Sequence, residues 1–188
     1  MKKKIGNQNV LYPMPVTIVG TLVNGKVNFL NVAHVGILNA GAPHLISLGM
    51  GKRHHSNIGI REKKTFSVNI LSQNQIVEAD YVGLVTGSTT DKSGVFETFF
   101  GELKTAPLIQ NCPVSMECRL HDINELKTHD VFIGEIMATY AEDAVLTGGK
   151  VDLSKVKPLL FDMSSMKYWS LGQPVGDCWN VGKQYKKS

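Results

Sequence analysis

A glycine-rich turn followed by two cations is the segment of this sequence best suited to hold an anion. Residues 47–64 read SLGMGKRHHSNIGIREKK, so that Lys52 and Arg53 follow the glycines and Ser56 precedes a short predicted helix. Free N–H groups at a helix start favour an anion, glycine allows close approach, and Arg can donate two N–H groups to phosphate. The segment therefore predicts a site for a phosphorylated cofactor, with Ser56 as the N-cap of the helix.

A solvated basic turn ahead of a surface helix is the alternative interpretation of these residues. The P-loop pattern is absent, because Arg53 stands where Ser or Thr is needed after Lys52. The dinucleotide fingerprint G-x-G-x-x-G is absent from this turn as well. The residues alone leave both interpretations open.

Two further segments combine polar groups with small residues. In NFLNVAHVG, over 28–36, Asn31 and His34 stand beside the small Ala33 at the end of a predicted strand. Over 80–92, glycines and small hydroxyl side chains lead to Lys92, whose ammonium can bind an anion. An ordinary strand end and a solvated loop are the alternatives for these two segments.

Metal and hydrolase chemistry have little support in the sequence. The six histidines form no HExxH motif and no Cys/His ligand spacing, and G-x-S-x-G is absent. Three cysteines fit reduced thiols better than a disulfide framework. Cys112 and Cys118 flank a predicted strand, so we expect them to be buried structural thiols.

Composition predicts one globular domain over residues 1–188. The chain is 43% hydrophobic and carries a net charge of +4, an excess smaller than that of five lysines near the chain ends, Lys2, Lys3, Lys4, Lys186 and Lys187. This charge is weak evidence for a nucleic-acid or membrane partner, and we expect neither. Because no apolar run resembles a membrane span or a secretory signal, the sequence predicts a cytoplasmic protein.

The clearest predicted element is a hairpin of strands over 16–23 and 26–32, joined by Asn24-Gly25. Further strands are expected over 44–48 and 65–71, followed by a capping box at Ser72-Gln-Asn-Gln75 and a helix to about Val82. Two long strands are expected later, over 114–121 and 131–140.

This order contains no regular alternation of strand and helix, which argues against a doubly wound sheet. A mostly β fold with short helices, built as a small antiparallel barrel, suits it best, because closure removes exposed strand edges. Residues 142–188 form a less regular C-terminal extension containing Tyr168, Trp169 and Trp179. We expect these aromatics to dock onto the core, a partner subunit or the flat face of a cofactor.

The three polar segments also belong to a longer series of motifs in a fixed order. The series is Pro13-Met-Pro15-Val16, Asn31, Ala42-Pro43-His44, the Lys52–Ile60 loop, Phe66–Asn69, Asp80–Lys92, Met116-Glu-Cys118 and Phe132-Ile-Gly134-Glu. Together these motifs resemble the flavin reductase-like family, in particular its flavoredoxin branch. The resemblance covers about 13–141, and the segment 168–182 is similar to that branch too.

The resemblance implies an FMN-binding split β-barrel, antiparallel and Greek-key-like, that forms a homodimer with FMN near the subunit interface. Residues of two segments would contact the flavin ring and ribityl chain, largely through backbone: Asn31, Val32, Ala33 and His34, and Ser47, Leu48 and Gly49. Arg53, Ser56 and Lys92 would hold the phosphate. Trp169, with Tyr168, would cover a flavin across the dimer, where 142–188 packs at the interface.

The sequence departs from the family pattern at Ala33-His34-Val35, where relatives often carry Ser or Thr and an aromatic residue. We hypothesise that His34 donates to the pyrimidine edge of a flavin, where negative charge builds on reduction.

The family resemblance implies an FMN-dependent oxidoreductase that passes electrons from NADH, NADPH or a redox partner to a small-molecule or protein acceptor. No catalytic acid or base is required. The alternatives are an electron-transfer protein that never meets a nicotinamide, a flavin or heme sensor, and a nucleic-acid-binding barrel whose aromatics stack on bases.

Overall fold

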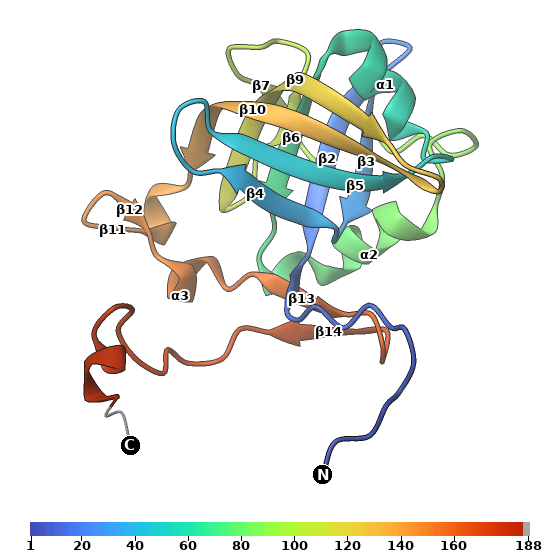
Figure 1. Cartoon of the computed structure of the whole chain (residues 1–188). Helices are drawn as coiled ribbons and strands as arrows, with labels where there is room; N and C mark the ends of the chain where they lie inside the picture. The colour runs from blue at the N-terminus through green and yellow to red at the C-terminus, as the bar shows by residue number, and fades with distance from the viewer. Residues whose placement is uncertain (186–188) are drawn as a thin grey trace.

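A seven-stranded antiparallel sheet forms the body of the protein, whose computed structural model describes residues 1–185. The strand order is β3-β2-β6-β9-β10-β5-β4, and the sheet is strongly curved (Figure 1). Its strands are β2 (Thr17–Val23), β3 (Lys26–Val32), β4 (Val35–Asn39), β5 (Leu45–Gly51), β6 (Thr65–Ile70), β9 (Val114–Glu125) and β10 (His129–Ala141). The predicted mostly β, antiparallel fold with short helices is confirmed.

The barrel is split rather than closed by hydrogen bonds. β3 and β4 are the two edge strands of the sheet, yet only Ala33 and His34 separate them along the chain. The chain therefore crosses from one edge of the sheet to the other at these two residues. These two residues belong to the segment 31–34, which the family resemblance predicts to contact a flavin.

The Asn24-Gly25 hairpin is confirmed by its backbone geometry. Asn24 has φ 51° and Gly25 has φ 80°, and a two-residue type I′ turn requires positive φ at both central positions. The register pairs Thr17 with Val32 and Val23 with Lys26. Asn28 and Asn31 on β3 therefore occupy fixed positions relative to the core.

The barrel interior is filled by large apolar side chains from alternate strand positions, among them Val19, Leu48, Met50, Phe66, Val68 and Phe132. Gly134 on β10 lies against the Phe66 ring, where a Cβ atom would come within 2.8 Å of Phe66 Cε1. Cys118 and Cys112 are buried as expected, and burial raises the pKa of the Cys112 thiol to about 11. These thiols are structural.

Two helices cover the barrel next to the candidate site. α1 (Ser56–Lys63) packs on β2, and α2 (Ile76–Leu84) packs against β3. A 3₁₀ turn, η1 (Gln73–Gln75), precedes α2, and its Ser72/Gln75 capping box is present as predicted. The predicted helix therefore exists, with one 3₁₀ turn at its start.

Short elements complete the chain around the barrel. They are β1 (Met14–Pro15), β7 (Thr98–Phe100), β8 (Pro107–Ile109), η2 (Asp143–Val145), β11 (Leu146–Thr147), β12 (Lys150–Val151), α3 (Leu153–Val156), β13 (Leu159–Asp162), β14 (Lys167–Ser170) and η3 (Val181–Gln184). β1, β13 and β14 form a small separate sheet beneath the barrel (Figure 1). No helix within residues 1–185 has the length and apolar character needed to cross a membrane.

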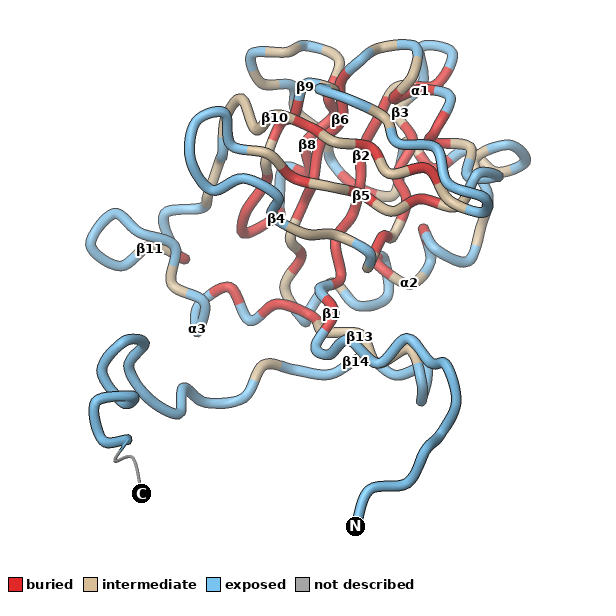
Figure 2. The backbone as a smooth tube through the Cα atoms, viewed as in Figure 1, coloured by how far each residue is buried: buried red, intermediate tan, exposed pale blue. Residues whose placement is uncertain are grey.

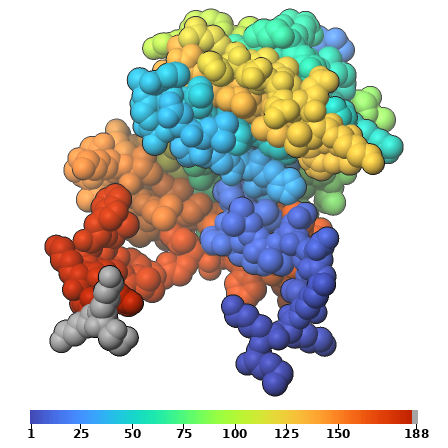
Figure 3. Space-filling model, viewed as in Figure 1, coloured from blue at the N-terminus to red at the C-terminus, as the bar shows by residue number. Residues whose placement is uncertain are grey.

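Both ends of the described chain stand away from the barrel. Residues 1–13 and 171–185 are almost entirely exposed in Figure 2 and form two separate projections in Figure 3. Trp179 is 92% exposed. Within a single chain, this tail does not dock onto the core.

Candidate functional site

A pocket of about 200 Å³ opens at the start of α1, where three segments meet. One segment is the β5–α1 loop, the second is β3, and the third is the end of α2 with the chain that follows it. The lining residues are Leu30, Arg53, His54, His55, Ser56, Gly83, Leu84, Val85, Thr86, Gly87 and Lys92. Three residues predicted to hold a phosphate, Arg53, Ser56 and Lys92, are thus brought together.

The two cations of the loop have different surroundings. Lys52 Nζ lies 2.7 Å from Asp130 Oδ1 and forms an ion pair with it. Arg53 is exposed, and no ion pair among residues 1–185 includes it. Arg53 is therefore the cation of this loop that remains available to a ligand at the pocket.

Ser56 is not the N-cap of α1, and that prediction was wrong. His55 holds the N-cap position, because the first turn already begins with Asn57 N donating to His54 O and Ile58 N to His55 O. Ser56 is 1% exposed, and its Oγ accepts a 2.7 Å hydrogen bond from Asn28 Nδ2. A hydroxyl that accepts one hydrogen bond keeps its own proton for donation. Ser56 can therefore still donate to an anion in the pocket.

Lys92 lies in the pocket wall and is only 3% exposed. Its Nζ donates to the carbonyl oxygens of Val82 and Val85, at 3.1 Å each, which leaves one of the three ammonium protons for another acceptor. Burial lowers the pKa of Lys92 to about 8. An anion in the pocket would oppose this shift.

His54 and His55 also line the pocket. Burial lowers the pKa of His54, and the nearby His129 and Lys92 lower it further. The side chains that line this pocket include no carboxylate. The pocket therefore suits an anion. No group of three or more His, Cys, Asp or Glu side chains in residues 1–185 is placed to hold a metal ion.

The two segments predicted to contact a flavin ring are adjacent in the structure. Gly49 N donates to His34 O at 2.7 Å, which joins β5 to the crossing point between β3 and β4. A Cβ atom at Gly49 would lie 3.1 Å from His34 Cβ, so glycine permits this close approach. Val32 and Leu48 have buried side chains and can reach a ligand only through backbone.

Ser47 and Asn31 point to different partners. Ser47 Oγ donates to Gly36 O at 3.2 Å, on the outer side of β5. Asn31 Nδ2 donates to Ala79 O at 2.9 Å and lines a second cavity of about 290 Å³. This cavity also contains Ala33 and shares Gly83 and Leu84 with the cationic pocket. The two cavities are therefore neighbours.

The second cavity contains a pair of residues that the sequence did not single out together. Tyr168 OH donates to Asp80 Oδ1 at 2.8 Å, which ties β14 to α2. Burial, followed by this contact with Asp80, raises the pKa of Tyr168 to about 12. The two residues are 88 positions apart in sequence, so no local pattern could have revealed the contact.

Trp169 does not line either of these cavities within its own chain. It lies on β14, is 58% exposed, and borders a separate cavity together with Tyr12 and Leu160. Its predicted contact with a flavin therefore depends on a second subunit and stays a prediction.

The flavin reductase like domain model matches residues 10–170 of this chain. The chain belongs to the flavin reductase-like family. The flavoredoxin of Methanosarcina acetivorans is 42% identical, with a TM-score of 0.94 over 97% of this chain and 98% of that one. The flavoredoxin of Desulfovibrio vulgaris is 30% identical, with a TM-score of 0.90 over 97% of this chain and all (100%) of that one. The predicted family, its flavoredoxin branch and its barrel fold are confirmed.

One relative is matched over only part of its own length. An uncharacterized protein of Aeropyrum pernix is 26% identical over 159 residues, which are 82% of this chain and 59% of that protein. This chain thus spans about three fifths of the length of that relative.

Membership of the flavin reductase-like family makes the chain a flavin-related redox protein.

Proposed function

We propose that this protein binds FMN, with the phosphate in the cationic pocket at the start of α1. The observation that carries this proposal is the charge pattern: Arg53 has no carboxylate partner within residues 1–185, Lys92 is buried, and the pocket lining described there includes no carboxylate. A phosphate dianion would accept from the Arg53 guanidinium, the Ser56 hydroxyl and the remaining Lys92 proton. The flavoredoxins named above support a flavin as the ligand.

The flavin ring belongs, in this proposal, beside the crossing point of the split barrel. The segments 31–34 and 47–49 meet there through the hydrogen bond from Gly49 to His34. When bound, the isoalloxazine accepts and releases electrons, and the protein binds it, orients it and sets its potential. His34 is exposed at this point and can donate a proton or a hydrogen bond to the ligand edge.

The electron donor is NADH, NADPH or a redox protein, and the acceptor is a small molecule or a protein. The similar proteins of Methanosarcina acetivorans and Desulfovibrio vulgaris are flavoredoxins, a name that specifies no nicotinamide donor. A non-enzymatic FMN electron carrier is therefore the second candidate function.

We also propose that the protein is a homodimer whose interface includes the C-terminal extension. Several large apolar side chains of the extension are exposed in the single chain, namely Met166, Trp169, Val175, Trp179 and Tyr185. Exposed apolar area of this kind is typical of an interaction surface.

Anaerobic reduction of the purified, gel-filtered protein tests the proposed function. A flavin absorbance spectrum that bleaches with NADH or NADPH would identify a reductase and its donor. Bleaching only with dithionite would identify the electron carrier. A colourless protein that does not bind added FMN would contradict both candidates.

A further inference from the structure

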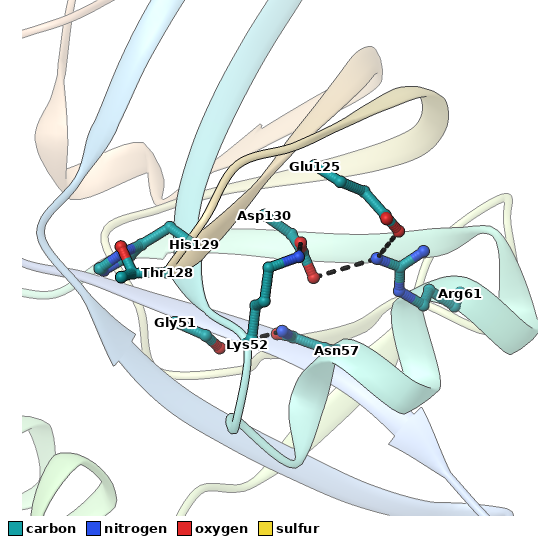
Figure 4. Close-up of polar contacts among 8 residues, drawn as sticks. All are labelled: Gly51, Lys52, Asn57, Arg61, Glu125, Thr128, His129 and Asp130. Carbon is teal, nitrogen blue, oxygen red and sulfur yellow. Dashed lines mark hydrogen bonds and ion pairs between the residues drawn. The ribbon is translucent and has the colours of Figure 1, made fainter.

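A buried carboxylate holds both sides of the loop that presents Arg53. Asp130, on β10, is 4% exposed. Its Oδ1 accepts from Lys52 Nζ at 2.7 Å and its Oδ2 from an Arg61 nitrogen at 3.0 Å (Figure 4). Lys52 directly precedes Arg53, and Arg61 lies on α1. One carboxylate therefore fixes the loop and the following helix to the same strand.

Backbone contacts hold the same loop in register with the β9–β10 hairpin. Lys52 N donates to Thr128 O at 3.2 Å, in the turn between the two strands. Asn57 Nδ2 donates to Gly51 O at 3.0 Å, which joins the start of α1 to the end of β5 (Figure 4). The residues between Gly51 and Asn57, including Arg53, are therefore held at both ends.

The ion pairs also determine which cation is left for a ligand. Both oxygens of Asp130 are engaged, by Lys52 and by Arg61. A carboxylate with a free oxygen near the loop would compete with phosphate for Arg53. Asp130 pairs with Lys52 and Arg61, and Arg53 takes part in none of the ion pairs of residues 1–185.

We propose that Asp130 is a positioning residue for phosphate recognition: it fixes the loop so that Arg53 faces the phosphate subsite. This inference rests on the proposed role of Arg53 in binding the FMN phosphate. The positioning role predicts that neutralising Asp130 weakens FMN binding, whereas the loss of its negative charge alone would strengthen it. Removing a negative charge strengthens anion binding by Coulomb attraction, whereas releasing the loop weakens it.

The test compares FMN with riboflavin, which differ only in the phosphate. The ratio of the riboflavin Kd to the FMN Kd then reports the phosphate contribution alone. We expect Asp130→Asn to lower this ratio roughly tenfold, the scale of losing one positioned charge-assisted contact, with the riboflavin Kd unchanged. Glu125→Gln is the matched control, because Glu125 pairs with Arg61 at an exposed site, and it should leave the ratio unchanged.

The double variant Lys52→Met with Asp130→Asn keeps the net charge and leaves neither member of this ion pair behind. Charge alone predicts no change in the ratio for this variant, whereas positioning predicts the same fall. A ratio that is unchanged or raised in both variants would overturn the role of Asp130.

Arg53→Ala separates this inference from the proposed function. If Arg53→Ala lowers the ratio and the Asp130 variants do not, only the positioning role fails. If Arg53→Ala leaves the ratio unchanged, the phosphate site itself is wrong and the positioning role falls with it.

Discussion

The ammonium of Lys92 lies 3.1 Å from the carbonyl oxygen of Val85, the residue that caps the C-terminus of α2. A cation at this position interacts favourably with the negative end of the helix dipole. The same ammonium lines the cationic pocket. Lys92 therefore links the end of α2 to the subsite that we assign to the FMN phosphate.

The affinity for FMN should fall as the pH rises above about 8. In the flavin-free protein, burial lowers the pKa of Lys92 to about 8. A bound phosphate favours the charged ammonium and therefore raises this pKa again. Binding then takes up a proton above that pH, so the FMN Kd increases by up to tenfold per pH unit. Titrations between pH 7 and pH 9.5 should show this rise in the wild type. Lys92→Met should bind FMN more weakly at pH 7 but without the rise, and an identical profile in both proteins would refute the assignment.

Removing the Tyr168 hydroxyl should loosen the C-terminal hairpin. Tyr168 OH donates to the Asp80 carboxylate at 2.8 Å, and Tyr168→Phe leaves this half-buried carboxylate without that donor. We expect a loss of about 1–2 kcal/mol in the free energy of unfolding, measured by urea denaturation. Tyr81→Phe is the matched control, because Tyr81 on α2 is 40% exposed and its hydroxyl makes no hydrogen bond within residues 1–185. Equal stabilities of the two variants would show that the Tyr168–Asp80 contact contributes nothing.

Tryptophan fluorescence can locate the C-terminal extension relative to the flavin. The chain has two tryptophans, Trp169 and Trp179. If Trp169 covers a flavin across the dimer, FMN should quench its emission through aromatic stacking. We expect Trp169→Phe to abolish most of the quenching and Trp179→Phe to preserve it. Quenching that survives only in Trp169→Phe would place the flavin near the end of the tail instead.

The contact between Gly134 and Phe66 should make Gly134 intolerant of any side chain. A Cβ atom at Gly134 would overlap the Phe66 ring and lie 3.2 Å from Cys118 Cβ, in a core with no exposed surface. We expect Gly134→Ala to cost about 1–3 kcal/mol in the free energy of unfolding. Gly94→Ala is the control, because a Cβ there meets no atom within 4 Å, and thermal unfolding should show little change for it. A Gly134→Ala protein as stable as this control would mean that the core adapts freely.

Local patterns predicted the elements that are encoded locally. The Asn24-Gly25 turn and the Ser72–Gln75 capping box each lie within four residues, and both were confirmed. The two long strands were also found, although they extend farther than predicted, to Glu125 and from His129. Most of the added residues are polar, among them Asp122, Asn124 and Glu125, so hydrophobic alternation stops before the strand does.

Contacts between distant segments could not be predicted from pattern alone. Asn28 Nδ2 donates to the Ser56 hydroxyl, 28 residues along the chain, and His55 rather than Ser56 is the N-cap of α1. Hairpin β13–β14 and its Tyr168 contact depend on a tertiary arrangement in a segment with weak alternation. The split of the barrel follows from strand pairing across the whole chain. The open edges at β3 and β4 agree with the split barrel that the family resemblance implied, whereas the argument from strand count and closure alone did not predict them.

The comparison of FMN with riboflavin in the wild-type protein tests the central claim most directly. Titration of the flavin-free protein, followed by flavin fluorescence at low ionic strength, gives both affinities. Two or more charge-assisted hydrogen bonds to the phosphate predict FMN binding at least about 100-fold tighter than riboflavin binding. Equal affinities would mean that the pocket formed by Arg53, Ser56 and Lys92 does not hold the phosphate, and would contradict the account.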